Sequence, residues 1–320
     1  MRPLPFFRLR FLLLCATLII FTFIPIVDKN LYHIDLLATV GVFVLLALGL
    51  NVIVGFAGLL NLGYAAFFAI GAYAYALLNL HWHVSFWPAL LLSAFCSAFF
   101  GALLAFPALR LTGDYLAIVT LGFGEIVRII LNNLDEITGG PNGLLGIAHP
   151  TLWNHYSFGV NPVPYYYLLL VLCAVIALSL ARLEDSRIGR AWIAIREDEL
   201  AASCMGIDLV QTKLLAFALG AGIAGIAGCV FASKQGTISP DSFDFILSVT
   251  VLSMIVLGGL GSIRGAILGA FVLTLLPEIL REFQMYRMLI FGVALILMML
   301  FRPQGLMGDI RHREELQKKV

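Results

Sequence analysis

Long apolar runs separated by short polar stretches dominate this sequence of 320 residues. A helix needs roughly 20 consecutive apolar residues to cross the hydrocarbon core of a bilayer. Several runs, such as 36–54 and 86–109, reach or exceed that length. Only 12% of the residues are charged, which is about half the share typical of soluble domains. The sequence therefore predicts an all-α fold, a polytopic transmembrane helical bundle.

The apolar pattern predicts about ten membrane-spanning helices. The first run follows a basic start, as in a signal peptide, but it is too long for one and no small-residue cleavage site follows it. We therefore expect it to be retained as a span. Glycines in the third run indicate a broken or re-entrant helix. The expected spans are residues 11–27, 36–54, 58–80, 86–109, 114–133, 165–181, 214–232, 246–260, 265–280 and 288–301.

Positive charge is distributed unequally between the predicted loops. Lysine and arginine are retained in cytoplasmic loops during insertion, so their distribution predicts orientation. With the N-terminus inside, fifteen of the 20 lysines and arginines fall in cytoplasmic segments, four fall outside, and Arg128 lies within a span. We therefore expect both termini in the cytoplasm. Arg281 and Arg287 fall on the outer side and oppose this arrangement for the last two spans.

Neither a soluble domain nor a catalytic motif is expected. The longest segments outside the membrane, 134–164 and 182–213, are too short to bury a core of their own, so residues 1–320 are expected to form a single transmembrane domain. The net charge of +1 indicates no nucleic-acid partner. No P-loop, HExxH or GxSxG pattern occurs, and the five cysteines have no CxxC spacing, so neither an enzyme nor a metal site is predicted.

Two features within the spans are candidates for a transport role. Glu125 and Arg128 stand at i and i+3 of one span, and such a pair either stabilises its own helix or lines a polar pathway. Asn61 and Gly63, at the break expected in the third span, are further pathway candidates.

Small residues recur at spacings of three and four, as at Ala218, Gly222 and Gly225. Such stripes let helix backbones approach closely, and the interfaces they form are either static or able to slide.

The segment 182–213 differs from the rest of the chain, because eleven of its 32 residues are charged. Acidic residues at 197–199 suit the first turn of a helix, and Gly206 suits a left-handed cap after the last turn. We therefore expect a short helix over 197–205. A helix this short is marginal alone in water, so it requires a surface to lie against.

Four stretches carry a resemblance to a known family. In chain order they are GLLNLGYAAFFAIGAYAYALL (58–78), LTGDYLAIVTLGFGEIVRIILNN with TGGPNGL (111–144), GRAWIAIREDELAASCMGI (189–207) and VLGGLGSIRGAILGAF (256–271). The stretch at 189–207 resembles the cytoplasmic coupling segment of ABC importer permeases, and all four, in this order, are similar to the branched-chain amino acid permease family of the LivM type. The general importer pattern E-A-A-x-x-x-G is extended here by Leu200 after Glu199, as in the branched-chain group.

The resemblance implies the permease subunit of an ABC importer for leucine, isoleucine and valine in the bacterial cytoplasmic (inner) membrane. It implies a second permease subunit of the LivH type, two cytoplasmic ATPase subunits that bind ATP and Mg, and a periplasmic or extracellular substrate-binding protein. Residues 183–212 would form the cytoplasmic coupling segment. The residues expected to contact the ATPase are Arg196, Glu197, Glu199, Ala202 and Gly206.

Other functions remain open at this stage. Importers of urea or short amides have similar permeases. An ion-coupled secondary transporter would carry carboxylates within the membrane, for which this chain offers Glu125 and Glu278. A membrane scaffold without transport would not require an exposed helix in the 182–213 segment.

Overall fold

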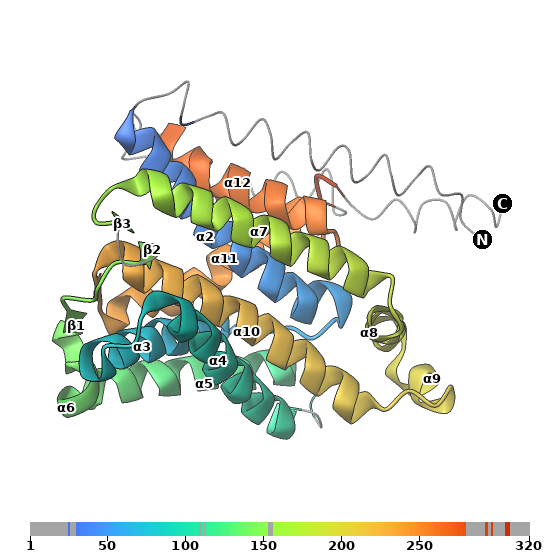
Figure 1. Ribbon diagram of the computed structural model, residues 1–320. Helices are drawn as coiled ribbons and strands as arrows, with labels where there is room; N and C mark the ends of the chain where they lie inside the picture. Colours follow the sequence, from blue (N-terminus) through green and yellow to red (C-terminus); the bar gives the residue numbers. More distant parts are fainter. Residues whose placement is uncertain are drawn as a thin grey trace.

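The computed structural model describes residues 30–108, 111, 113–152, 156–279 and 305–307, with 25, 292, 293 and 296 as single positions. The expected spans 11–27 and 288–301 lie outside the described residues apart from those single positions. Figure 1 shows the described chain as a bundle of long helices.

The predicted helical bundle is confirmed. The long helices are α2 (Leu31–Leu50), α3 (Tyr64–Trp82), α4 (Phe86–Ala108), α5 (Asp114–Asn133), α7 (Pro162–Glu184), α10 (Leu209–Gln235), α11 (Phe245–Gly258) and α12 (Ile263–Ile279). The short elements are the π-helical turn η1 (Asn51–Phe56), α6 (Asp135–Thr138), η2 (Gly140–Asn142), α8 (Arg187–Glu197), α9 (Glu199–Cys204) and η3 (Pro240–Phe243), with strands β1 (Leu144–Leu145), β2 (Thr151–Leu152), β3 (Tyr156–Ser157) and β4 (Thr237–Ile238).

Within the described residues, six helical segments are long and apolar enough to cross a membrane. The helices α5 and α12 coincide with the expected spans 114–133 and 265–280 but are not among the six. The chain is therefore multi-pass, and the count of ten spans stays a prediction. The six segments are Leu31–Phe56, Tyr64–Trp82, Phe86–Pro107, Pro162–Glu184, Leu209–Gln235 and Pro240–Gly258.

The helix α10 packs against α2, α3 and α4 at the centre of the bundle. Small residues make this packing close, as the stripe at Gly222 and Gly225 predicts. A Cβ added to Gly71 of α3 would lie 2.6 Å from the carbonyl oxygen of Gly225, and one added to Gly49 of α2 would lie 2.9 Å from that of Gly220. Since these neighbours are backbone atoms, any side chain here would force the helices apart. Close packing is confirmed, whereas sliding of the interfaces stays a prediction.

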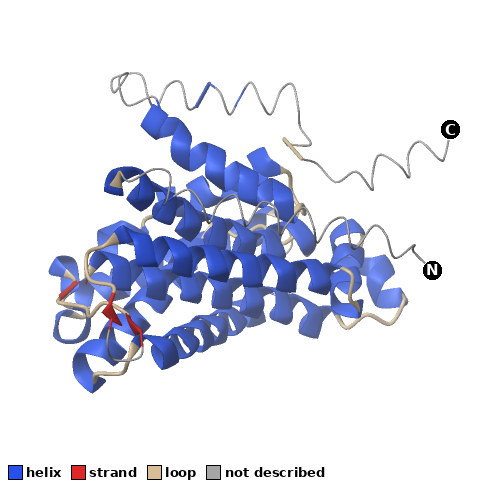
Figure 2. Ribbon diagram, turned by 45° about the horizontal axis from the view of Figure 1, so that its top comes forward, coloured by secondary structure: helices blue, strands red, loops and turns tan. Residues whose placement is uncertain are grey.

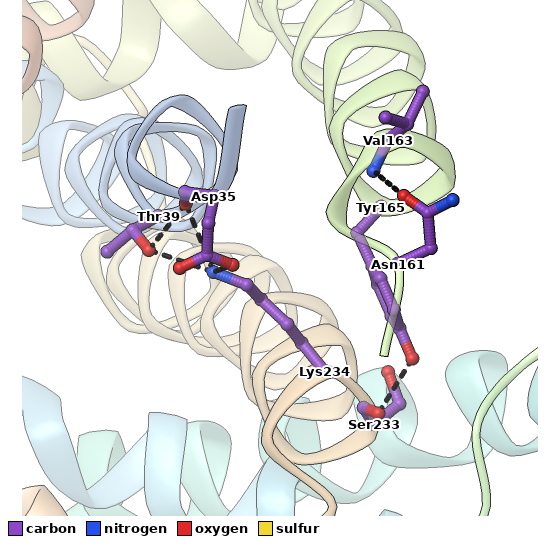
Figure 3. A network of polar contacts seen from close by, with 7 residues as sticks. All are labelled: Asp35, Thr39, Asn161, Val163, Tyr165, Ser233 and Lys234. Atoms are coloured by element: carbon purple, nitrogen blue, oxygen red, sulfur yellow. Dashed lines mark hydrogen bonds and ion pairs between the residues drawn. The ribbon is translucent and has the colours of Figure 1, made fainter. Parts of the chain in front are cut away.

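Polar side chains join α10 to α2 and α7 near the end of the bundle that carries the strands (Figure 3). The ammonium of Lys234 lies 2.9 Å from Asp35 Oδ1 and donates to Thr39 Oγ1 over 2.9 Å. The Tyr165 hydroxyl donates to the Ser233 carbonyl over 2.8 Å. Lys234 is largely buried and Ser233 completely so, and buried polar groups need such partners. These contacts join three helices.

The two ends of the bundle differ in construction, as Figures 1 and 2 show: the strands and α6 lie at one end, and α8 and α9 at the other. At the strand end, β1 pairs with β4 and β2 pairs with β3, both antiparallel. The segment 138–146 contains η2, with Gly139 and Gly140 at positive φ. The Tyr75 hydroxyl fastens the segment that follows by donating to the Ala148 carbonyl over 2.7 Å.

Candidate functional site

The charged segment forms two helices, so the expected single helix over 197–205 is wrong in its bounds. Glu197 ends α8, and Asp198 has extended backbone angles that break the helix. The Asp198 carboxylate then accepts hydrogen bonds from the N–H groups of Leu200 and Ala201, at 2.8 and 2.9 Å. This N-cap starts α9 at Glu199, and Gly206, at φ +83°, follows its end as expected.

Two contacts fasten this pair of helices to α10. Trp192 of α8 is completely buried, and its indole N–H donates to the Thr212 carbonyl over 2.7 Å. The ammonium of Lys213 lies 2.7 Å from a carboxylate oxygen of Glu199. Since α10 packs against α2, α3 and α4 at the centre of the bundle, these contacts join the charged segment to the helical core.

The structure separates the five predicted coupling residues into two groups. Ala202 is buried, and Arg196, although 31% exposed and 3.3 Å from Glu197, donates to the Gly55 carbonyl of its own chain over 2.6 Å. Glu197 and Gly206 are exposed, and Glu199 is half-buried against Lys213. Glu197 and Gly206 therefore remain open to a partner, whereas Arg196 and Ala202 hold the segment in place.

Large apolar side chains on this segment are exposed, and two of them, Leu200 and Met205, are more exposed than Ile188 and Val210. Leu200 is 76% exposed and Met205 is 84% exposed. Neither residue is among the coupling residues predicted from the sequence, where Leu200 is noted only as the residue that extends the importer pattern. Large exposed apolar side chains on an element that is fixed to the rest of the protein are typical of protein-interaction sites.

The second candidate site begins where α3 starts. Its first residue is Tyr64 and not residue 58, because the preceding segment 57–63 is non-helical and largely buried. Side chains satisfy its backbone: Asn61 Oδ1 accepts from the Gly63 N–H over 3.0 Å, and Thr120 Oγ1 accepts from the Leu62 N–H over 3.1 Å. The predicted break in the third span is therefore confirmed, and it lies against α5.

The crossing of this segment with α5 depends on glycine. A Cβ on Gly63 would overlap the Thr120 carbonyl oxygen, and one on Gly124 would lie 3.1 Å from the Cα of Gly63. Asn61 is completely buried, and its Nδ2 has no hydrogen-bond partner among the described residues. The sequence candidates Asn61 and Gly63 thus stand beside the middle of α5.

Glu125 and Arg128 form the expected pair on α5, with 3.1 Å between Glu125 Oε2 and Arg128 Nε. Each side chain is 35% exposed. A charged pair in an otherwise apolar helix is costly to leave in lipid, so this face of α5 is suited to water or to another protein.

A small pocket joins these elements. It brings together two of the four pathway candidates, Gly63 and Glu125, while Asn61 and Arg128 do not line it. The sequence reasoning missed Asp244 and Ser248, which begin α11 and line the same pocket, because only the fold places them beside α3. The Ser248 hydroxyl accepts from the Ala65 N–H over 2.9 Å. The lining residues are Leu62, Gly63, Ala65, Ala66, Leu121, Gly124, Glu125, Phe243, Asp244, Phe245 and Ser248.

The chain matches a family model over residues 32–299, and the family is described as the permease component of the branched-chain amino acid transport system. This match includes both candidate sites. A comparison with solved structures gave no significant match.

Individual relatives give the same result. The chain is 47% identical to the high-affinity branched-chain amino acid transport system permease protein LivM of Salmonella typhimurium, over 89% of this chain and 72% of the relative. It is 46% identical to LivM of Escherichia coli over the same shares. It is also 26% identical to LivH of Salmonella typhimurium, over 86% of this chain and 93% of that protein.

Proposed function

The chain belongs to the family of branched-chain amino acid transport permease components, and from this premise we propose that it is the LivM-type permease subunit of an ABC importer for leucine, isoleucine and valine. The observation that carries the proposal is the 47% identity to LivM over 89% of the chain. The exposed helix α9, which is joined to α10, also supports the proposal, because an importer permease needs a cytoplasmic element that its ATPase subunits can move.

The proposed importer has further subunits. A LivH-type permease would complete the pathway, two cytoplasmic ATPase subunits would bind ATP and Mg, and an external binding protein would deliver the substrate. This chain would be non-catalytic, with residues 1–320 as a single permease domain in the inner membrane. The end of the bundle with α8 and α9 would face the cytoplasm, as would both termini.

Coupling would occur through the 183–212 segment. When nucleotide binding closes the ATPase subunits, movement of the docked α9 would pass through Lys213 and Thr212 to α10. A docked element that differs in its contacts between two states can drive alternating access. The exposed Leu200 and Met205 would fill a groove of the ATPase, with Glu197 and Gly206 at its edge.

The translocation pathway would run along the open face of α5. Glu125 and Arg128 offer opposite charges to the ammonium and carboxylate of an amino acid. Gly63 allows the non-helical segment 57–63 to lie close to α5, and the Asn61 side chain satisfies a backbone N–H within that segment. Such contacts would be transient, because a transporter must release what it binds.

The decisive experiment uses vesicles that contain the reconstituted complex, with ATP enclosed or omitted, and compares uptake of labelled leucine with uptake of labelled urea. We expect leucine uptake only with ATP and only when the ATPase subunits are present. Preference for urea would assign the chain to the related amide importers. Uptake that follows an ion gradient without ATP would identify a secondary transporter and contradict the proposal.

A further inference from the structure

One side chain of the coupling segment, that of Arg196, contacts the membrane bundle, although it is 31% exposed and its Nη2 also lies 3.3 Å from Glu197 Oε1. Arg196, the penultimate residue of α8, donates from Nη1 to the Gly55 carbonyl over 2.6 Å. Its aliphatic stem covers Gly58, where an added Cβ would lie 2.6 Å from Arg196 Cγ. At Gly261, in the turn between α11 and α12, an added Cβ would lie 2.8 Å from Nη1. We call Arg196, Gly55, Gly58 and Gly261, together with Asn51, the Arg196 clasp.

The acceptor in this clasp lies in an irregular part of the helix. Gly55 belongs to η1, the π-helical turn that ends α2, and the last carbonyls of a helix have no partner within it. The N–H of Leu59, which would bond to Gly55 in an α-helix, donates instead to the Ile53 carbonyl over 3.0 Å. An arginine at a helix C-terminus satisfies such a carbonyl and the negative end of the helix dipole.

Asn51 extends the clasp to a third element. Its Oδ1 accepts from the Gly261 N–H over 3.0 Å, so the end of α2 holds the turn between α11 and α12. Gly261 has φ +80°, which a residue with a side chain adopts only under strain. Asn51 is completely buried, and its Nδ2 has no hydrogen-bond partner among the described residues. The Asn51 amide N–H donor is therefore unsatisfied in this arrangement of the Arg196 clasp. A second arrangement of the same groups would be able to give it a hydrogen-bond partner.

On the basis of the proposed function, we propose that Arg196 is a positioning residue that transmits movement of the coupling segment to η1 and to the α11–α12 turn. Trp192 and Lys213 connect the segment to α10 alone. Arg196 adds contacts with η1, at the end of α2, and with the turn between α11 and α12. In this role the guanidinium contacts its own chain, and not the ATPase subunits.

The test uses the assembled importer with Arg196→Ala, and with Arg190→Ala as the matched control. Arg190 is also on α8, but it is exposed, and its guanidinium donates to the nearby Asp185 carbonyl over 2.7 Å. We expect Arg196→Ala to keep ATPase-subunit co-purification and ATP hydrolysis while ATP-driven leucine uptake falls about tenfold, the scale of one lost charge-assisted hydrogen bond. Arg190→Ala should keep ATPase-subunit co-purification, ATP hydrolysis and leucine uptake unchanged. Added guanidinium ion should restore uptake in Arg196→Ala.

A spectroscopic measurement separates transmission from simple loss of structure. Spin labels are placed separately at Ile188→Cys on α8 and Leu260→Cys in the α11–α12 turn, both exposed positions. In the unsubstituted complex, nucleotide should change the mobility of both labels. With Arg196→Ala, the label at 188 should still respond and the label at 260 should not.

Two results would overturn the proposal. One is a loss of ATPase-subunit binding that matches the loss of uptake, since Arg196 would then be a partner contact. The other is a label at 260 that responds equally with and without Arg196. If Arg196→Ala fails to assemble, Arg196→Lys provides the same comparison with the charge and stem retained. If even the unsubstituted complex shows no ATP-driven uptake, the proposed function fails, and the label at 260 still decides the role of Arg196.

Discussion

Lys213 of α10 and Glu199 of α9 form an ion pair with 2.7 Å between Nζ and Oε1, and only 4% of the lysine side chain is exposed. The carboxylate belongs to a helix of six residues that has few other ties to the bundle. A buried ammonium without a counter-charge is strongly unfavourable. This pair therefore holds α9 in its position.

Glu199→Gln should consequently destabilise the protein. Because Glu199 is partly exposed, we expect a loss of about 1–3 kcal/mol, less than the full cost of breaking a buried pair. The double variant Glu199→Gln with Lys213→Met should recover part of the loss, since it removes the unpaired charge. Thermal unfolding in detergent measures both. Glu197→Gln is the control, because the exposed Glu197–Arg196 pair is worth at most about 1 kcal/mol. Equal stability of the Glu199 and Glu197 variants would contradict this role.

Leu200 and Met205 should matter for assembly and not for folding. Both side chains are largely exposed in this chain, so Leu200→Asp and Met205→Asp should each change the free energy of unfolding by no more than about 0.5 kcal/mol. Burial of each apolar group in a partner is worth about 1.5–3 kcal/mol, so each change should weaken ATPase-subunit binding at least tenfold. Co-purification measures this. Val160→Asp, an exposed apolar position at the strand end of the bundle, should leave that binding unchanged.

Glu125→Gln should reduce transport more than stability. The Glu125–Arg128 pair is half-exposed and lies within one helix, so its contribution to stability is at most about 1 kcal/mol. If the face of α5 contacts substrate, loss of the carboxylate should raise the leucine concentration needed for half-maximal uptake. Uptake kinetics and detergent melting are compared on the same preparation. If uptake and stability fall to the same extent, the Glu125–Arg128 pair has a purely structural role.

The sequence predicted the long elements well because lipid imposes a simple requirement on them. Runs of apolar residues matched α4, α5 and α7 to within a few positions. The start of α5 at Asp114 follows Gly113, at φ +58°. Charge density likewise located the segment that forms the short helices α8 and α9. These signals are local, and neighbouring elements do not alter them.

What the sequence missed depends on contacts between distant segments. From the sequence, Lys213 would be a cation in an exposed loop. In the structure its side chain is buried and paired with Glu199 of α9. Asn51 lies within an apolar run, and the reason for a polar side chain there becomes clear only from the fold, because its amide oxygen accepts from the Gly261 N–H. The split between α8 and α9 had a local signal, since Asp198 is a good N-cap, but Glu197 and Glu199 were equally plausible as first-turn residues.

The crossing of the 57–63 segment with α5 provides a matched pair of glycine substitutions. A Cβ at Gly63 would overlap the Thr120 carbonyl oxygen, whereas a Cβ at Gly122 would meet nothing within 4 Å. Gly63→Ala must therefore push two backbone segments apart, at a cost of about 1–3 kcal/mol, and should also reduce uptake. Gly122→Ala should stabilise α5 by about 0.5–1 kcal/mol, because alanine favours the helix. Detergent melting of both variants is the measurement. A Gly63→Ala protein as stable as Gly122→Ala would show that the close crossing is not required, and the pocket beside Glu125 would lose its structural basis.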